Sequence, residues 1–338
     1  MLLGQRRKSV ASKAKWKFYE KRSNFRDFYF HKVLRRHIFE RYFNKDPYLP
    51  IYANHRVLGM NKTNQIIGER IQSGEPFMVA RFGNTELSVM TSVLKRRIFG
   101  HTEENDARLK EWFQNLQDLS GFFPDQIELA EQFTDLMLDC CKETDILAMY
   151  HCHMDDYIVT EYMKNCKVTF LNHIEPWRSK DPWTAALKGK KVLVIHPFDE
   201  SIKQQYQKRT QLFSNDKVLP EFELKTLKAI QTIAGETDER FETWFDALEY
   251  MHQEAMKIDF DIAILGCGAY GLPLAAKLKK AGKQAIHMGG VTQILFGIKG
   301  RRWLDNPRAG IAFNDAWEFP KESETPRNCN VVENHCYW

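Results

Sequence analysis

Short runs of apolar residues alternate with longer amphipathic stretches from about Pro76 onward. The short runs are hydrophobic throughout and predict buried β-strands, at residues 77–81, 145–150, 167–171, 191–196, 260–265 and 284–288. The longer stretches predict α-helices, at residues 84–95, 107–119, 126–141, 201–212, 240–257 and 270–281. Strands without a polar face, joined by helix-length connections, are typical of a parallel sheet covered on both sides. We therefore predict an α/β fold, a Rossmann-like, doubly wound, mostly parallel sheet with helices on both faces.

The first 46 residues have a different pattern, in which basic residues are mixed with aromatic ones spaced three or four apart. This pattern predicts a basic helical extension of one or two amphipathic helices. Residues 1–46 hold 14 lysines and arginines against 4 acids, a net charge of +10, and because the whole chain carries +5, the remainder carries −5. Such a helix can lie on an anionic membrane surface, or it can pack on the main domain or on a second copy of the chain in a homo-oligomer. Nucleic acid is not an expected partner, because the basic segment is short and the body is negative.

These patterns divide the chain into three expected regions: the basic extension at 1–46, a linker with a lead-in helix at 47–71, and the α/β domain at 72–338. No apolar run is long enough for a signal peptide or a membrane span. The seven cysteines form no C-x-x-C motif, which favours reduced, mostly buried thiols. We expect a cytoplasmic protein that can associate peripherally with the inner face of the membrane.

Candidate binding residues follow the first predicted strand, in the sequence "RFGNTE". Ligands of open parallel sheets bind beyond the carboxyl ends of the strands. Arg81 can bind a phosphate group and Gly83 allows a tight turn, while Asn84 and Glu86 can both offer oxygen to one divalent cation. The alternative is helix capping, because Asn84 is an acceptable N-cap and Glu86 would lie in the first turn.

Two further junctions carry candidate acceptor or base residues. Glu175, with Trp177 nearby, can contact a sugar, although a structural role is the alternative. His196 ends the fourth predicted strand and Asp199 follows it, and either side chain can act there as a general base. Asp199 can also be no more than a helix cap.

The sequence "LGCGAYG" forms a G-x-G-x-x-G turn from Gly266, Gly268 and Gly271. Such a turn lets a backbone approach a phosphate at a helix N-terminus. A dinucleotide site also needs an acid about twenty residues later, but the next predicted strand is followed by Gly289 and Gly290. We therefore expect phosphate or nucleotide binding, and the alternatives are a turn used only for packing, or the cofactor site of an oxidoreductase or methyltransferase.

The sequence "YHCHMDD" contains His151 and His153, which would share one face if the preceding strand continued through them. Asp155 is close in sequence, so a metal site is conceivable there, without a complete ligand set in view.

The blocks "RFGNTE", "HIEPW…DPWTAALKGKKVLVIHPFDESI", "ILGCGAYGLPLAAKLKKAGKQAIHMGGVTQILFGIKGRRW" and "VVENHCYW" together resemble bacterial glycosyltransferases of the GT-D fold, associated with capsular and other surface polysaccharides. The resemblance covers roughly residues 72–338. It implies transfer of a sugar from a nucleotide-diphosphate donor, with UDP-sugars favoured, to a glycan or lipid-linked acceptor.

The resemblance also assigns roles to residues. Its acidic pair, which holds Mn²⁺ or Mg²⁺ on the donor diphosphate, falls on Asn84 and Glu86, and Asn is the weaker, neutral ligand. The late glycine loop would hold the nucleotide through Gly268, Tyr270 and Gly271. In this scheme Glu86 positions the cation, and the candidate bases are those at the middle junctions, Asp199, His196 and Glu175. A non-catalytic protein that binds a sugar nucleotide is the alternative that Asn84 raises.

Overall fold

The computed structural model describes residues 2–29, 50–236, 238–304, 306, 309–326, 329 and 336–338, without the side chains of residues 2–10 and 234. The second part of the predicted basic extension and most of the "VVENHCYW" block lie outside the described residues.

One sheet of nine strands organises the described chain, in the order β1-β2-β5-β4-β3-β9-β8-β6-β7. Only the pairing of β1 with β2 is antiparallel, and the other pairs are parallel. The strands are β1 (Ile51–Tyr52), β2 (His55–Leu58), β3 (Phe77–Ala80), β4 (Ile146–Met149), β5 (Lys167–Phe170), β6 (Lys191–His196), β7 (Glu223–Lys228), β8 (Ile262–Leu265) and β9 (Gln284–His287).

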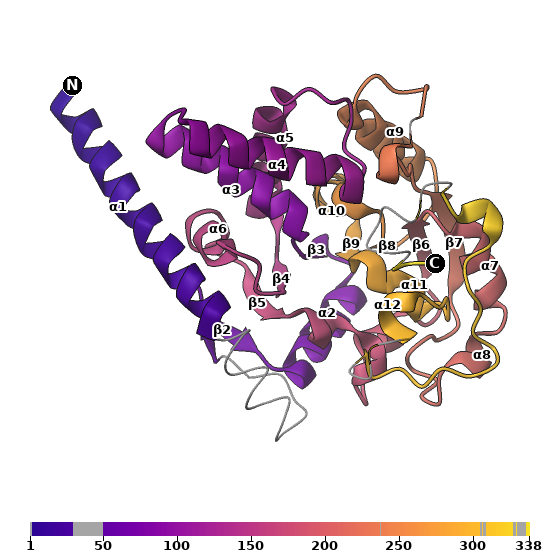
Figure 1. Cartoon of the computed structure of the whole chain (residues 1–338). Helices are drawn as coiled ribbons and strands as arrows, with labels where there is room; N and C mark the ends of the chain where they lie inside the picture. The colour runs from indigo at the N-terminus through magenta and orange to yellow at the C-terminus, as the bar shows by residue number, and fades with distance from the viewer. Residues whose placement is uncertain are drawn as a thin grey trace.

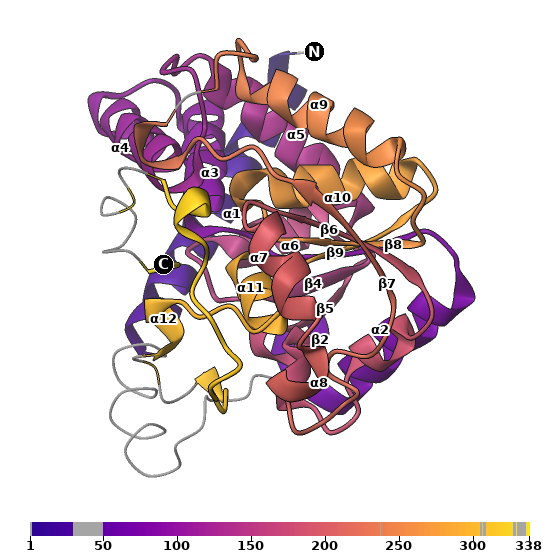
Figure 2. The ribbon, with the colours of Figure 1, turned by 90° about the vertical axis from the view of Figure 1, so that its right-hand side faces the viewer.

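Two layers of helices enclose this sheet, which Figure 2 shows between them. One layer contains α1 (Leu2–Arg26), α3 (Asn84–Phe99), α4 (Glu103–Ser120), α5 (Leu129–Glu143), α6 (Asp155–Tyr162), α9 (Trp244–Met256) and α10 (Gly271–Lys280). The other contains α2 (Met60–Ser73), α7 (Asp199–Tyr206), α8 (Arg209–Leu212), α11 (Thr292–Leu295) and α12 (Arg301–Leu304). Short 3-10 helices join them: η2 (Leu171–Ile174), η3 (Pro176–Arg178), η4 (Trp183–Leu187), η5 (Ile233–Gly235), η6 (Gly268–Tyr270), η7 (Gly289–Val291) and η9 (Glu322–Glu324).

Successive side chains of the buried strands point to opposite faces of the sheet, so a separate hydrophobic core forms on each face. In β3, Met78 packs in the core beneath α3 and α10, while Phe77 and Val79 pack in the opposite core. All four residues of β3, β4, β8 and β9 are buried. A strand needs apolar side chains on both faces when both faces are covered, so the predicted doubly wound α/β fold is confirmed.

The six strands predicted from apolar runs all occur, with ends that differ by one or two residues. The short strands β1 and β2 and the strand β7 are additional. β7 has the sequence "ELKTLK" and none of its residues is buried, because it lies at an edge of the sheet. The region predicted as a linker and lead-in helix, residues 47–71, contributes β1, β2 and most of α2, so part of it belongs to the sheet.

Helix α1 lies against the body of the molecule, beside α3 and α6 (Figure 1). Trp16, Tyr19, Ser23 and Arg26, spaced three or four apart, are buried. The opposite side of the helix exposes Phe18 and Phe25. Packing on the main domain, one of the alternatives for this segment, is therefore what its described part does. Among the described helices, none is long and apolar enough to cross a membrane.

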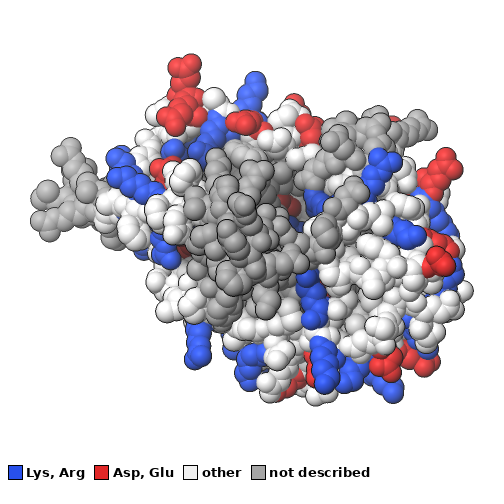
Figure 3. Space-filling view, turned by 60° about the horizontal axis from the view of Figure 1, so that its bottom comes forward, with Lys and Arg blue, Asp and Glu red and all other residues white. Residues whose placement is uncertain are grey.

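Charged side chains of both signs are interspersed over the face that Figure 3 shows. Exposed charges on the described surface form ion pairs, for example Lys217 with Asp181 and Arg97 with Asp135. Such surface pairs contribute little to stability individually.

Candidate functional site

The carboxyl ends of β3, β9 and β8 lie side by side near the middle of the sheet. The register aligns Val79 of β3 with Ile286 of β9, and His287 of β9 with Leu265 of β8. The chain after β3 and after β8 continues into helices of one layer, whereas the chain after β9 continues into α11 of the other layer. Segments that diverge in this way open a crevice where ligands of α/β sheets bind.

Arg81 follows β3 and its side chain crosses to the neighbouring strand. A Cβ atom added to Gly289, just beyond β9, would lie 2.3 Å from Nη1 of Arg81. Gly289 also has a φ of +70°, a conformation that glycine adopts without strain. Nε of Arg81 donates a hydrogen bond to the carbonyl of Phe82 at 3.2 Å, which fixes one side of the guanidinium. The result is a positive charge held across two strand ends.

Gly290, the next residue, faces an aromatic side chain from the C-terminus. An added Cβ would lie 2.5 Å from Cε1 of Tyr337. The hydroxyl of Tyr337 accepts a hydrogen bond from Nη1 of Arg302 at 3.1 Å, which brings a second arginine near this edge of the sheet. The glycine pair is therefore needed for close packing from both sides, by Arg81 on one and Tyr337 on the other.

Asn84 and Glu86 do not converge. Both lie in the first turn of α3, and helix residues two positions apart do not face each other. The Glu86 side chain is buried and folds back, so that an added Cβ on Gly83 would lie 1.8 Å from its Oε2. This carboxylate accepts a hydrogen bond from the hydroxyl of Thr85 at 2.8 Å. Asn84 is exposed and points elsewhere, into the cavity described below.

These positions do not fit a shared divalent cation. A Mn²⁺ or Mg²⁺ site needs several oxygen ligands around one point, and here the two expected ligands diverge. Across the part of the chain that the structure describes, no group of three or more His, Cys, Asp or Glu side chains could hold a metal ion.

The late glycine turn makes room for buried histidines. A Cβ on Gly266 would lie 2.4 Å from Cδ2 of His196, and one on Gly271 would lie 2.0 Å from Cε1 of His287. Gly268 has a φ of +56°, which the turn into α10 requires. For Gly266 and Gly271 this geometry favours the packing alternative, whereas Gly268 has no neighbour this close.

Tyr270 lies in the core rather than at the sheet edge. Its side chain is 2% exposed and its ring stacks on Trp244, with the ring centroids 4.7 Å apart. Burial raises the pKa of this phenol. The Tyr270 ring is therefore out of reach of a nucleotide. Its stack on Trp244 instead anchors the start of α10, which follows Tyr270 directly.

The two histidines under the glycine turn are neutral. Burial lowers the pKa of His196 to about 3, and burial together with Arg81 lowers the pKa of His287 to about 3. Nδ1 of His196 accepts a hydrogen bond from the backbone N–H of Phe198 at 3.0 Å. A general base must offer a lone pair to substrate, and these contacts favour a structural role for His196.

The other expected bases are engaged with neighbouring cations. Asp199 is buried at the start of α7, where its Oδ2 accepts from Lys203 at 2.8 Å and its Oδ1 is buried without a hydrogen-bond partner among the described residues. Glu175 forms a close ion pair with Arg178 after β5. Strand β5 is two positions from β3 in the sheet, on the side away from β9. The structure therefore does not bring Glu175 next to the Arg81–Gly289 contact.

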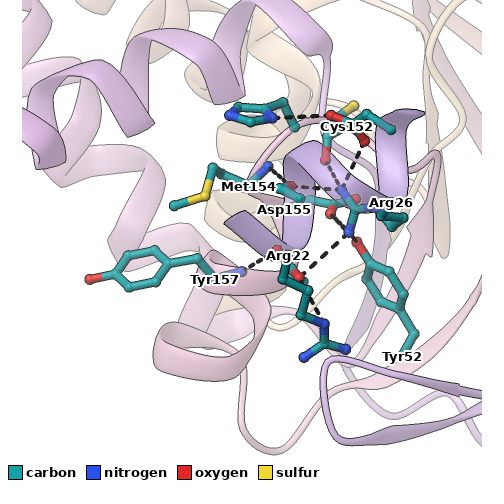
Figure 4. A network of polar contacts seen from close by, with 11 residues as sticks. Arg22, Arg26, Tyr52, Cys152, Met154, Asp155 and Tyr157 are labelled. Carbon is teal, nitrogen blue, oxygen red and sulfur yellow. Dashed lines mark hydrogen bonds and ion pairs between the residues drawn. The ribbon is translucent and has the colours of Figure 1, made fainter. Parts of the chain in front are cut away.

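The chain after β4 docks α1 through a buried ion-pair network (Figure 4). Arg26 of α1 donates to the carbonyl of Cys152 at 2.8 Å and lies 3.1 Å from the carboxylate of Asp155. Tyr52 bridges the same pair through its hydroxyl. The backbone N–H of Met154 donates to the hydroxyl of Ser23 at 2.8 Å. One helix turn of α1 therefore holds the whole loop between β4 and α6.

Burial controls the ionisation of this network. It raises the pKa of Asp155 to about 6, although Arg26 opposes the rise. Burial also raises the pKa of Cys152 to about 12, with Asp155 adding to the effect and Arg81 and Glu86 close enough to act on it in opposite directions. The loop after β4 thus lies within electrostatic reach of the residues that follow β3.

A polar cavity of about 400 Å³ opens beside this loop. Its walls come from α1, α3, α4 and the loop after β4, and its lining residues are Glu20, Asn24, Asn84, Ser88, Arg108, Trp112 and His153. Strand β4 ends at Met149, so His151 and His153 do not share a strand face as the sequence suggested. His151 packs against Tyr52 and Phe170 instead.

Sequence reasoning missed most of this cavity. The histidine-rich sequence after β4 was a usable signal for His153. Its partner Asp27, whose Oδ2 lies 3.1 Å from Nδ1 of His153, comes from the basic extension. Nothing in the local sequence connects residues so far apart.

The chain matches no family model and no curated protein. Among solved structures, it is similar to two structures of the domain of unknown function 1792, one of which is described as having a distinct glycosyltransferase fold and the other of which contains selenomethionine. In each case the identity is 15%, the alignment covers 80% of this chain and 93% of the other, and the TM-score is 0.40.

Proposed function

We propose that the protein is a glycosyltransferase that moves a sugar from a nucleotide-diphosphate donor, of the UDP-sugar class, to a glycan or lipid-linked acceptor in surface polysaccharide synthesis. The observation that carries this proposal is the Arg81 guanidinium lying over Gly289 at the carboxyl ends of β3 and β9. A cation above a backbone without side chains is suited to a diphosphate, which needs both charge neutralisation and close approach. Arg81 belongs to the block "RFGNTE" and Gly289 to the late glycine block, two of the blocks that resemble GT-D enzymes.

The chain's own residues supply the electrostatics of the proposed reaction. Glycosyl transfer builds negative charge on the departing diphosphate. Arg81 would bind that charge, and Arg302 approaches the same edge through Tyr337. His196 and His287 are buried beneath the turn with lowered pKa values, so the positive charge available to the diphosphate comes from the arginines.

The outer face of α1 supports a membrane-surface acceptor. Phe18 and Phe25 of α1 are 60% and 67% exposed, Phe28 just beyond its end is 59% exposed, and Lys17 and Lys21 are exposed on the helix. Aromatic and basic side chains together are typical of helices that lie in the interface of anionic membranes. A lipid-linked acceptor would be met at such a surface, on the cytoplasmic side.

A non-catalytic protein that binds a sugar nucleotide is the second candidate. The divergence of Asn84 and Glu86 favours it, because the cation that would assist the departing diphosphate has no site between them. Both candidate functions use the same donor site, but only the glycosyltransferase would convert the bound nucleotide sugar.

Binding and turnover of nucleotide sugars test the proposal. UDP, UDP-sugars, GDP-sugars, NAD and S-adenosylmethionine are compared by calorimetry, followed by assays of nucleotide release. We expect UDP compounds to bind, and Arg81→Gln to weaken them about tenfold, since a charge-assisted hydrogen bond contributes roughly 1.5–3 kcal/mol. Arg56→Gln is the control, because Arg56 is exposed on β2.

If UDP binds wild type and Arg81→Gln with equal affinity, Arg81 does not bind the diphosphate and the proposal loses its main support. Selective binding of NAD or S-adenosylmethionine would replace the proposal with an oxidoreductase or a methyltransferase. If a nucleotide sugar binds but its sugar is transferred neither to water nor to any acceptor, the non-catalytic candidate is favoured.

A further inference from the structure

The cavity between α1 and α4 has the composition of a carbohydrate site. Its volume of about 400 Å³ falls within the range of small-ligand pockets, roughly 300–1,000 Å³. Trp112 supplies one aromatic wall, and an aromatic face packs against the apolar face of a sugar ring. Asn24, Asn84 and Ser88 add amide and hydroxyl groups, which can both donate and accept hydrogen bonds.

Two charged groups of opposite sign complete the lining. Glu20 of α1 accepts a hydrogen bond from Lys95 at 3.1 Å, which fixes its carboxylate, and Arg108 of α4 adds a guanidinium. A sugar offers hydroxyl groups in several directions and is held by such mixed donors and acceptors. An apolar ligand would leave these groups unpaired at a cost.

His153 has the environment of an oriented imidazole. Its Nδ1 lies 3.1 Å from Oδ2 of Asp27, the residue directly after α1, and the same Asp27 lies 3.5 Å from Nη2 of Arg26. A carboxylate at one ring nitrogen fixes the tautomer, with the proton on Nδ1 and the lone pair on Nε2. The ring lines the cavity, so Nε2 is the nitrogen left for a ligand.

The cavity adjoins the proposed donor site. Asn84, the first residue of α3, lies three residues after Arg81 in the chain that leaves β3. His153 lies in the loop after β4, the strand that neighbours β3 in the sheet. Both sites are therefore built from segments that leave the carboxyl ends of neighbouring strands, the side of the sheet on which donor and acceptor would have to meet for direct transfer.

We propose that this cavity binds the acceptor sugar and that His153 is the general base for its hydroxyl. The inference rests on the proposed function. The acceptor hydroxyl gives its proton to Nε2 of His153 as its oxygen bonds to the anomeric carbon of the donor sugar. The bond from that carbon to the diphosphate oxygen breaks, and its electron pair leaves with the diphosphate. Asp27 is a positioning residue that holds the imidazole through Nδ1.

Sugar binding is tested without any nucleotide. Saturation-transfer NMR is recorded with glucose, galactose, mannose, rhamnose, N-acetylglucosamine and glucuronic acid. We expect at least one sugar to bind, with about tenfold weaker affinity in Asn24→Ala and in Trp112→Ala. Lys110→Ala is the matched control, because Lys110 is exposed on α4 and does not line the cavity. The Asn24 variant keeps the test valid if the partly buried Trp112 variant misfolds.

The catalytic role is tested with the sugar that binds and a UDP-sugar donor. We expect His153→Gln to leave sugar affinity within about twofold but to lower sugar-dependent UDP release about 100-fold or more, the usual contribution of a general base. Asp27→Asn should lower kcat about tenfold with KM unchanged, which a loss of structure would not do.

Two results would overturn the inference: no sugar receives saturation, or both cavity variants bind it like wild type. Unchanged sugar-dependent release in His153→Gln would overturn the assignment of the base. Calorimetry with UDP separates these failures from that of the proposed function. UDP binding without sugar binding defeats only the acceptor site, and sugar binding without UDP binding defeats only the donor proposal.

Discussion

The proposed donor site depends on the contact between Arg81 and Gly289. Replacing Gly289 by alanine adds a methyl group that would disrupt this contact. In Gly289→Ala, the added Cβ would lie 2.3 Å from Nη1 of Arg81, so the flexible guanidinium must move. We expect UDP affinity to fall about tenfold, as for loss of one charge-assisted hydrogen bond. Calorimetry measures it.

Gly74→Ala is the matched control for backbone strain. Gly74 has a φ of +72°, close to that of Gly289, but no atom lies within 4 Å of its added Cβ. Both variants should lose roughly 1–2 kcal/mol of stability from the left-handed conformation. Equal UDP affinity in the two variants would mean that Arg81 does not need its place over Gly289.

Arg26 neutralises two buried carboxylates, and its removal should be felt most at high pH. Burial raises the pKa of Asp155 to about 6 in the folded protein, above its unfolded value of 3.8. The contribution of this group to stability is therefore full below the unfolded value and is lost as pH rises through 6. Arg26→Met raises the folded pKa further, because Arg26 is the group that lowers it.

The resulting loss of stability should be small near pH 4 and reach about 3–5 kcal/mol at pH 8. Urea unfolding followed by tryptophan fluorescence measures it, and Trp16 on α1 reports local detachment. Lys21→Met is the control, since Lys21 is an exposed basic residue of the same helix. A loss that does not change with pH would contradict the account of the network.

The sequence predicted which residues lie at the sheet edge better than it predicted their contacts. Arg81 and Gly289 follow strands that are apolar on both faces, and parallel strands must end together. Whether Gly266 serves a ligand or a neighbour depends on His196, a residue 70 positions away, and no local pattern encodes that distance. The same holds for Asn84 and Glu86, which are close in sequence but separated by the helical turn that begins at Asn84.

Among the elements, the buried strands were predictable and the edge strands were not. β4 and β8 are covered on both faces, so every position is apolar and the run is visible. β7 has mixed polarity because one of its edges has no neighbour in the sheet. Helix α1 is intermediate: its helical spacing was visible, but which face is buried depends on α3 and α6.

The outer face of α1 gives a prediction at this scale. Phe18→Ser with Phe25→Ser should lower association with anionic vesicles about tenfold, because two exposed aromatic side chains no longer enter the headgroup region. Vesicles of phosphatidylglycerol and phosphatidylcholine are used in a sedimentation assay. Phe319→Ser is the matched control, because Phe319 is 49% exposed outside α1. Undiminished sedimentation of the double variant would leave α1 with only its packing role.

At the scale of the whole molecule, two dry cores enclose all seven cysteines. Each of them is buried and unpaired. Burial raises the pKa of Cys140, Cys152, Cys166 and Cys267 to about 12. A thiol reacts as its thiolate and needs access to the reagent.

We therefore expect less than about one thiol per chain to react with Ellman's reagent within minutes in native buffer. All seven should react in urea, which serves as the control for the total number of thiols. Rapid labelling of one cysteine in the native protein would show that one of the cores opens to solvent.

The docking of α1 against the loop after β4 also has a consequence for the order in which the chain folds. Arg26 and the carbonyl that it binds are 126 residues apart in sequence. During synthesis α1 is complete long before its binding partners on β4 and α6 exist, and contacts at such separation form slowly. We expect α1 to join last, after the sheet has assembled, so that the cavity becomes complete only in the final step of folding.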